Sequence, residues 1–273
     1  MNIRSAGIIN DTIKPYYSGD DSLIFNSDCL EVLSCIGENS IDMIFADPPY
    51  LLSNNGFTCR SGKMASVNKG EWDKSNGFET DALFHDTWIA ACRRVLKPGG
   101  TLWISGTYHS IYQCGYALQK NDFHILNDIA WFKPNAAPNL SCRFFTASHE
   151  TLIWAKKDKR AAHTFNYDEM KNGSFPEDKM KKENTQMRSV WSIPAPQKGE
   201  KEFGKHPAQK PVDLLVRIIK ASTNSGDIIL DPFNGSGTTG IAAALTGGRF
   251  YIGAETDTFF CELTVKRFLH IHD

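Results

Sequence analysis

The chain has 273 residues, of which 41% are hydrophobic and 22% charged, and its formal net charge is −1. This length suits one large domain with an insertion and argues against an array of domains. The near-zero charge excludes nucleic-acid binding by bulk positive charge, although it leaves room for a local basic face. No apolar run approaches the roughly 18 residues of a membrane helix, the first residues lack the apolar stretch of a signal peptide, and the seven cysteines include no C-x-x-C pair. We therefore expect a cytoplasmic protein with reduced cysteines and no zinc site.

Strands and helices are predicted to alternate along the first part of the chain. Strands are expected at 22–27 and 41–46, with a helix between them that begins after Asp28, whose spacing to Glu31 is that of a capping box. Residues 51–77 show no apolar period and are predicted to form a long loop, which in a compact domain is usually functional or mobile. A helix at about 81–96, a strand at 101–105, a helix near 109–120 and strands at 125–132 and 150–155 follow.

The segment from 156 to 210 differs from the rest of the chain in charge. It contains 13 Lys and Arg against 8 Asp and Glu, a net charge of +5, which leaves −6 for the remainder. We expect an inserted region over 156–205, with 1–155 and 206–273 forming one domain. The alternation then resumes, with helices at about 211–222, 238–246 and 257–269 and strands at 227–230 and 250–253. This pattern predicts an α/β fold with a doubly wound, mostly parallel, Rossmann-like sheet.

A glycine-rich turn follows the strand at 227–230 and precedes a helix. Glycines let the backbone approach a ligand closely, and the helix start offers unpaired N–H groups. Glu255 lies 20 residues after Gly235, where an acid can accept hydrogen bonds from a ribose. No Lys follows the glycines, which argues against a P-loop, and Asp231 before the turn would repel a pyrophosphate. The turn therefore predicts a nucleoside ligand with a cationic amine, such as S-adenosylmethionine, although glycines at helix starts also serve packing alone.

The tetrad Asp47-Pro48-Pro49-Tyr50 follows the strand at 41–46. Ligands of open α/β sheets bind outside the carboxyl ends of the strands, so the tetrad and the glycine turn can face one cleft. The Asp47 carboxylate and the Pro48 carbonyl are two acceptors for an exocyclic amine, and an exposed Tyr50 would stack on the base that carries it. That base must first leave the duplex. The alternative is that the tetrad is only a turn.

Together these motifs resemble the amino-group DNA methyltransferases that use S-adenosylmethionine. The tetrad comes first and the turn D-P-F-x-G-S-G-T-T-G last, which is similar to the circularly permuted beta group, with the inserted region as target-recognition region. The segments at 45–53 and 137–145 are similar to the second methyltransferase of Dpn II-type restriction systems, which methylates adenine in GATC and also accepts single strands. The resemblance implies a bacterial or phage enzyme of a restriction-modification system that modifies adenine N6 in DNA without a metal.

The resemblance also implies roles for individual residues. The residues of the target-amine pocket would be Asp47, Pro48, Pro49 and Tyr50. S-adenosylmethionine would be bound by Asp28, Cys29, Asp47, His206, Lys210, Asp231, Phe233, Asn234, Gly235, Ser236, Gly237, Thr238 and Glu255. Within this set, His206 and Lys210 belong to the element H-P-x-Q-K-P, and Lys210 would contact the cofactor carboxylate. Without the resemblance, those two residues would be interpreted as a solvated helix start.

Other side chains are candidates for contacts with the DNA. The basic runs 156–160 and 179–182 would meet phosphates, although such runs are more often solvated surface. The segments Trp72-Asp73 and Trp131-Phe132-Lys133 supply aromatic candidates for holding the flipped base, and Trp131 could equally belong to the core. A cognate restriction endonuclease and a homodimer are further partners that the resemblance implies.

Several other activities remain as alternatives. Cytosine-N4 methylation uses the same geometry, although an Asp-initial tetrad favours adenine in this family. Cytosine-C5 methylation is disfavoured because the sequence has no Pro-Cys pair for the nucleophile. Methylation of protein glutamine or of ribosomal RNA guanine usually goes with Asn-initial tetrads. An inactive DNA-binding module on the same scaffold is the alternative outside the enzymes.

Overall fold

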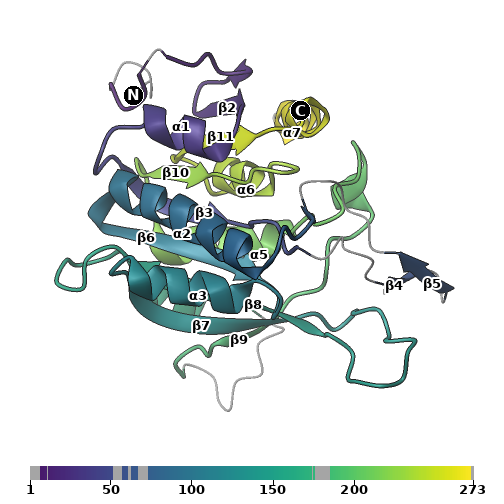
Figure 1. The fold of residues 1–273 in the computed structure, drawn as a ribbon. Coiled ribbons are helices and arrows are strands. Elements are labelled where there is room, and N and C mark those ends of the chain that lie inside the picture. The colour runs from purple at the N-terminus through teal and green to yellow at the C-terminus, as the bar shows by residue number, and fades with distance from the viewer. Residues whose placement is uncertain are drawn as a thin grey trace.

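The computed structural model describes residues 7–10, 12–51, 57–60, 63–66, 73–173, 175 and 185–271. Within them, one sheet of nine strands has the order β1-β2-β11-β10-β3-β6-β8-β7-β9, as Figure 1 shows, and β4 and β5 form a separate pair. The strands are β1 (Tyr17–Ser18), β2 (Ser22–Asn26), β3 (Ile41–Ala46), β4 (Phe57–Arg60), β5 (Lys63–Ser66), β6 (Leu96–Gly106), β7 (His124–Phe132), β8 (His149–Lys156), β9 (Val190–Ser192), β10 (Ile228–Asp231) and β11 (Phe250–Glu255).

The direction of the strands confirms the predicted mostly parallel sheet. β2, β11, β10, β3 and β6 pair in parallel, whereas β8 is antiparallel to both β6 and β7. β7 therefore runs in the same direction as β3 and β10, and β9 pairs with it in parallel. The carboxyl ends of these strands lie at one edge of the sheet, which we call the carboxyl edge. Ligand sites of such sheets form at this edge.

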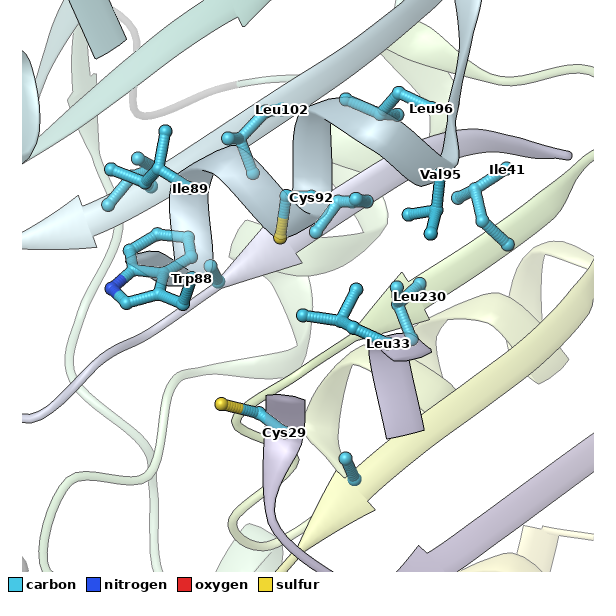
Figure 2. Packing of buried hydrophobic residues seen from close by; sticks show 14 of the residues in the cluster. Cys29, Leu33, Ile41, Trp88, Ile89, Cys92, Val95, Leu96, Leu102 and Leu230 are labelled. Atoms are coloured by element: carbon cyan, nitrogen blue, oxygen red, sulfur yellow. The ribbon is translucent and has the colours of Figure 1, made fainter. Parts of the chain in front are cut away.

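Helices cover both faces of the sheet. They are α1 (Cys29–Cys35), α2 (Phe78–Val95), α3 (Ile111–Lys120), α4 (Tyr167–Asn172), α5 (Val212–Ser222), α6 (Thr238–Thr246) and α7 (Thr258–Ile271), with a short 3-10 helix at Gly199–Lys201. Buried residues of α1, α2 and α3 form one core cluster with the sheet, and those of α5, α6 and α7 form a second. Figure 2 shows Trp88, Ile89, Cys92 and Val95 of α2 within the first cluster, which also includes Leu102 and Leu230 of the sheet. Burial of these apolar side chains is the main stabilising contribution.

Two details differ from the sequence predictions. The predicted long loop at 51–77 contains the antiparallel pair β4 and β5, because Phe57-Thr58-Cys59-Arg60 is rich in residues that favour strands. Asp28 caps α1 by accepting from the Leu30 N–H at 2.8 Å, but Glu31 does not complete a capping box and accepts instead from the Ser27 hydroxyl. No helix in the described ranges is both long and apolar enough to span a bilayer.

The predicted insertion shares the main sheet with the rest of the chain. β9, from within 156–205, pairs with β7, and Trp191 and Ile193 are buried in the second core cluster. The run 156–160 was predicted to meet phosphates, but Lys156 is buried and donates to the Ala161 carbonyl at 3.0 Å. Because β8 is antiparallel to β6, Lys156 pairs with Thr101 in the middle of β6, and the N–H groups of Lys157 and Asp158 donate to the carbonyls of Gly100 and Pro98, so the run leads away from the carboxyl edge. The run 179–182 and Trp72 lie outside the described residues.

Candidate active site

The tetrad and the glycine turn lie next to each other at the carboxyl edge. β3 ends at Ala46 and β10 ends at Asp231, and these two strands pair in parallel. A cavity of about 440 Å³ lies between their ends, a size usual for small-molecule sites. Of the predicted site residues, those that line it are Asp28, Cys29, Asp47, Pro48, Pro49, Tyr50, His206, Lys210, Asp231, Phe233, Asn234, Gly235, Ser236, Thr238 and Glu255. The cavity thus brings together almost the whole predicted set.

Gly237 is the predicted site residue that does not line the cavity. It is the N-cap of α6 with φ +75°, a left-handed conformation that favours glycine. A Cβ atom there would lie 2.5 Å from Cγ2 of Thr264 on α7. Gly237 therefore shapes the turn by permitting a tight approach of α7, and its predicted contact with a ligand has no support in this position.

We expect Gly237→Ala to destabilise the protein by about 2–5 kcal/mol, because it adds both left-handed strain and a clash with Thr264. Urea unfolding would measure the change. Gly226→Ala is the matched control, since Gly226 has φ +91° but no atom within 4 Å of an added Cβ, and it should cost only about 1 kcal/mol. Equal losses in the two variants would contradict the role assigned to the approach of α7.

The acids of the turn are held by hydrogen bonds within the turn. Asp231 accepts from the Thr239 hydroxyl at 2.5 Å and from the Phe233 N–H at 3.0 Å. Burial, opposed by these two hydrogen bonds, raises the pKa of Asp231 to about 7. Glu255 accepts from the Gly235 N–H at 2.8 Å and from the Asp257 N–H at 2.9 Å. A buried acid with a raised pKa is a natural partner for a cationic group of a ligand.

The element that carries His206 and Lys210 packs against the turn. A Cβ atom on Gly235 would lie 3.3 Å from the His206 ring, and the ring contacts Phe260 with centroids 4.3 Å apart. His206 Nδ1 accepts from the Ala208 N–H at 3.2 Å. These contacts favour the predicted placement at the site over a solvated helix start.

Asp47 belongs to a buried network of charged and hydroxyl groups. Its Oδ1 accepts from the Tyr50 hydroxyl at 2.7 Å, and its Oδ2 is paired with the Lys210 ammonium. Glu150, the second residue of β8, accepts from Lys133 Nζ at 2.9 Å, and its Oε2 lies 2.9 Å from the Tyr50 hydroxyl oxygen and 3.8 Å from Lys210 Nζ. The network therefore contains two carboxylates and two ammonium groups.

The charges in this network stabilise one another. Burial would raise the pKa of Glu150, but the ammonium groups of Lys210 and Lys133 outweigh it and lower the pKa to about 2. Burial would lower the pKa of Lys210, yet the carboxylates of Asp47 and Glu150 raise it above its ordinary value. Glu150 and Lys210 are thus both ionised at neutral pH.

One expectation about the site is wrong in this structure, and another stays a prediction. Tyr50 was predicted to be an exposed aromatic, but it is only 4% exposed and its hydroxyl lies 3.1 Å from the Ser105 hydroxyl in addition to its contacts with Asp47 and Glu150. The Lys210 ammonium pairs with Asp47 and lies near Glu150, and its predicted contact with the cofactor carboxylate stays a prediction. Both residues still line the cavity.

Glu150 and Ser105 were not predicted as site residues, and Asp73 has a role other than the predicted one. Asp73 is fully buried and its Oδ1 accepts from the N–H groups of Tyr50 and Leu51, each at 2.9 Å, so it fixes the backbone just after the tetrad. The only signal for Glu150 in the sequence is an acid at the start of an apolar strand.

A second cavity, of about 230 Å³, lies on the other side of this network. Its lining includes Tyr50, Trp131, Lys133, Glu150 and Lys210, together with Pro196 and Lys201 from the predicted insertion. Trp131 is 2% exposed, belongs to the second core cluster and donates from Nε1 to the Ile193 carbonyl at 2.7 Å. The structure therefore favours the core role for Trp131 while leaving part of it at the cavity wall.

A Rossmann-like sheet with a glycine turn and an acid at neighbouring strand ends is typical of nucleotide-dependent enzymes, and comparison with known sequences identifies the family. Residues 41–266 match the family model described as DNA methylase, so the chain belongs to this family of DNA methyltransferases. It is 50% identical to the type II methyltransferase M2.MboI of Moraxella bovis, covering 95% of this chain and 92% of that protein. It is 49% identical to the type II methyltransferase M2.DpnII of Streptococcus pneumoniae, covering 93% and 92%. The resemblance to the second methyltransferase of Dpn II-type systems is confirmed.

Solved structures show the same fold. The crystal structure of an M1.HpyAVI–SAM complex is 27% identical, with a TM-score of 0.66 over 90% of this chain and 98% of that chain. The cytosine-N4-specific PvuII DNA methyltransferase is 19% identical, with a TM-score of 0.73 over 95% and 90%. These matches confirm the Rossmann-like methyltransferase fold.

Proposed function

We propose that this chain transfers a methyl group from S-adenosylmethionine to N6 of an adenine in DNA, as the modification enzyme of a type II restriction-modification system. The observation that carries the proposal is the Asp47 carboxylate at the end of β3, in one cavity with the glycine turn after β10. The names of the relatives at 48–50% identity support the same activity.

The residues of the larger cavity suit S-adenosylmethionine. The buried Asp231 is an acceptor for its ammonium group, and Glu255 at the end of β11 is an acceptor for its ribose. The turn around Gly235 lets the backbone approach closely, since Gly235 has φ +52°. When bound, the cofactor supplies an electrophilic methyl on a sulfonium sulfur, which becomes a neutral thioether as the N–C bond forms and the C–S bond breaks.

The tetrad would orient the target amine. Asp47 would accept a hydrogen bond from N6 of the flipped adenine, and the Pro48 carbonyl would accept the second, which directs the nitrogen lone pair at the methyl group. The carboxylate also stabilises the positive charge that develops on N6, and it is the acceptor for the proton that N6 then loses. Asp73 holds the backbone after the tetrad and thereby limits its movement during the reaction.

Identification of the modified nucleoside tests the proposal. The protein is incubated with S-adenosylmethionine carrying a labelled methyl group and with unmethylated DNA, in duplex and in single-stranded form, and the DNA is digested to nucleosides. We expect the label in N6-methyladenine. Label in N4-methylcytosine would contradict the adenine assignment, and the absence of label in any DNA would favour the inactive binding module.

Binding of S-adenosylmethionine should weaken as the pH falls through about 7, because Asp231 must be ionised to pair with the ammonium group. With a pKa of about 7, the dissociation constant at pH 6 should be about tenfold higher than at pH 8.5. Titration calorimetry across this range measures the effect. Asp231→Asn should bind weakly with little pH dependence, and an unchanged pH profile in that variant would assign the titration to another group.

Loss of the Asp231 charge should also change stability. The pKa of this acid in the folded protein lies above its unfolded value, so it destabilises the fold as the pH rises through about 7. Asp231→Asn should therefore unfold at a higher urea concentration than the unmodified protein at pH 8.5, and the difference should shrink at low pH. Urea unfolding of both proteins at pH 8.5 and at low pH gives the comparison.

The inserted region and the partners belong to the same proposal. Pro196 and Lys201 line the smaller cavity, which supports a target-facing role for the described part of 156–205. An endonuclease of the same specificity would cut the unmethylated site, and cleavage protection of DNA treated with this protein would identify that site. The homodimer stays a prediction, which sedimentation with and without DNA would test.

A further inference from the structure

The connection between β7 and β8, residues 133–148, extends from the carboxyl edge beside the active site. β7 runs in the same direction as β3, so its end lies at the same edge as the tetrad. The Lys133 N–H donates to the Ser148 carbonyl at 2.7 Å and closes the base of the loop, where Lys133 also pairs with Glu150 of the buried network. Figure 1 shows the loop projecting well beyond the sheet, on the same side as the β4–β5 pair.

The far end of this connection exposes two aromatic side chains. Phe144 is 68% exposed and Phe145 is 97% exposed, directly after Arg143, which is also exposed. Burial of a phenylalanine side chain is worth about 1.5–3 kcal/mol, and neither residue gains that here. Adjacent exposed aromatics on a projecting loop are typical of a surface that contacts another molecule.

Hydrogen bonds hold the far end of the loop in shape. We call residues 139–146 the loop tip. Asn139 Nδ2 donates to the Phe144 carbonyl at 2.8 Å, and Asn139 Oδ1 accepts from both the N–H and the hydroxyl of Ser141 at 3.0 and 2.8 Å. Cys142 adopts φ +54°, which turns the chain toward the aromatic pair. The loop tip is therefore held in shape by its own hydrogen bonds, and the side chains of Phe144 and Phe145 remain exposed to solvent.

The charge of the connection suits a polyanion. Residues 133–148 contain no Asp or Glu; Lys133 pairs with Glu150 of the buried network, and Arg143 at the loop tip is an exposed cation. The basic run 156–160, by contrast, leads away from the carboxyl edge of the sheet. Of these two basic segments, the connection is the one that shares an edge with the Asp47 site, and a DNA methyltransferase must bring phosphates to that edge.

We propose that Phe144 and Phe145 enter the base stack of duplex DNA where the target base has left it, while Arg143 contacts a phosphate. This inference rests on the proposed function, since only a flipped base leaves such a gap. Apolar side chains inserted between base steps offset the loss of stacking, and stacking of an aromatic ring on a base stabilises the open form. The loop tip would thus open the duplex, and Asp47 would receive the base.

Methylation of three substrates by Phe144→Ala/Phe145→Ala tests the inference. All three are unmethylated and contain the sequence that the protein methylates. The first is a matched duplex, the second a duplex whose target adenine faces an abasic position, and the third a single strand. The double variant should methylate the matched duplex about 10- to 100-fold more slowly under single-turnover conditions, as expected for lost stacking. It should methylate the abasic duplex, whose target base is already unpaired, within about threefold of the unmodified protein.

A fluorescence measurement reports the flipping step directly. A duplex with 2-aminopurine at the target position should brighten when the unmodified protein binds at saturation, and it should brighten much less with the double variant. Tyr116→Ala is the matched control, because Tyr116 on α3 is an aromatic that is 67% exposed and lies outside both cavities. It should behave like the unmodified protein on all substrates.

The outcomes separate the two proposals. Equal losses of the double variant on matched and abasic duplexes, or no loss on either, would overturn the insertion of Phe144 and Phe145 while leaving the proposed function intact. Failure of the unmodified protein to methylate any of the three DNAs would overturn the proposed function and this inference with it.

Discussion

Asp47→Ala is expected to lower the rate of methyl transfer by about 10³-fold, because it removes the acceptor that orients the target amine and stabilises its developing charge. Binding of S-adenosylmethionine should change by no more than about threefold, since Asp231 and Glu255 are untouched. Single-turnover rates with labelled cofactor and calorimetric titration measure the two effects separately. Lys210 keeps Glu150 as a partner in this variant, so the fold should persist.

Asp86→Ala is the matched control for this experiment. Asp86 lies on α2, pairs with Lys120 at 2.9 Å and lines neither cavity. Its removal should leave the rate of methyl transfer within about twofold. Near-normal turnover in Asp47→Ala would refute the role of the carboxylate in the reaction.

Lys210→Met is expected to reduce the free energy of unfolding by about 3–5 kcal/mol at neutral pH. The substitution leaves the carboxylates of Asp47 and Glu150 buried near one another, and Lys133 is the remaining cation of the network among the described residues. Burial already raises the pKa of Asp47 above its ordinary value; without Lys210 it should rise further, and the pKa of Glu150 should rise above its unfolded value. The deficit is therefore present at high pH and should shrink as the pH falls toward 4, which urea unfolding at several pH values would show.

Two further variants sharpen the Lys210 experiment. Glu150→Gln combined with Lys210→Met removes one negative charge together with the positive one, and it should recover part of the lost stability. Lys220→Met removes an exposed lysine whose partner Glu169 lies at 3.4 Å, and it should cost less than about 1 kcal/mol. A loss for Lys210→Met no larger than for Lys220→Met would show that the buried pair contributes little.

The motifs at the strand ends could be predicted from the sequence because each consists of consecutive residues that directly follow an apolar strand. Asp47 directly follows an apolar strand and Asp231 ends another, and parallel strands bring such positions to one edge of the sheet. The glycines before α6 could be recognised in the same way. Fifteen of the sixteen predicted site residues consequently line one cavity, and Gly237 lies just behind it.

The features of the site that could not be predicted depend on the direction of β8, which the pattern of apolar residues does not specify. Because β8 is antiparallel to β6, its second residue, Glu150, reaches the carboxyl edge, and the basic run that begins at its last residue, Lys156, leads away from that edge. The same reversal brings Glu150 to the Tyr50 hydroxyl, 100 positions earlier in the chain, and buries that tyrosine. One strand direction thus explains the missed acid, the buried tyrosine and the wrong placement of the basic run.

The pairing of β3 with β10 has a consequence for the synthesis of the protein. Asp231 lies 184 positions after Asp47, so the two sides of the active site come from distant parts of the chain. Until β10 leaves the ribosome, one edge of β3 lacks its partner, and contacts between such distant segments form slowly. We expect a nascent chain that ends before Ile228 to bind no cofactor, so that methylation capacity arises only once nearly all of the chain has been made.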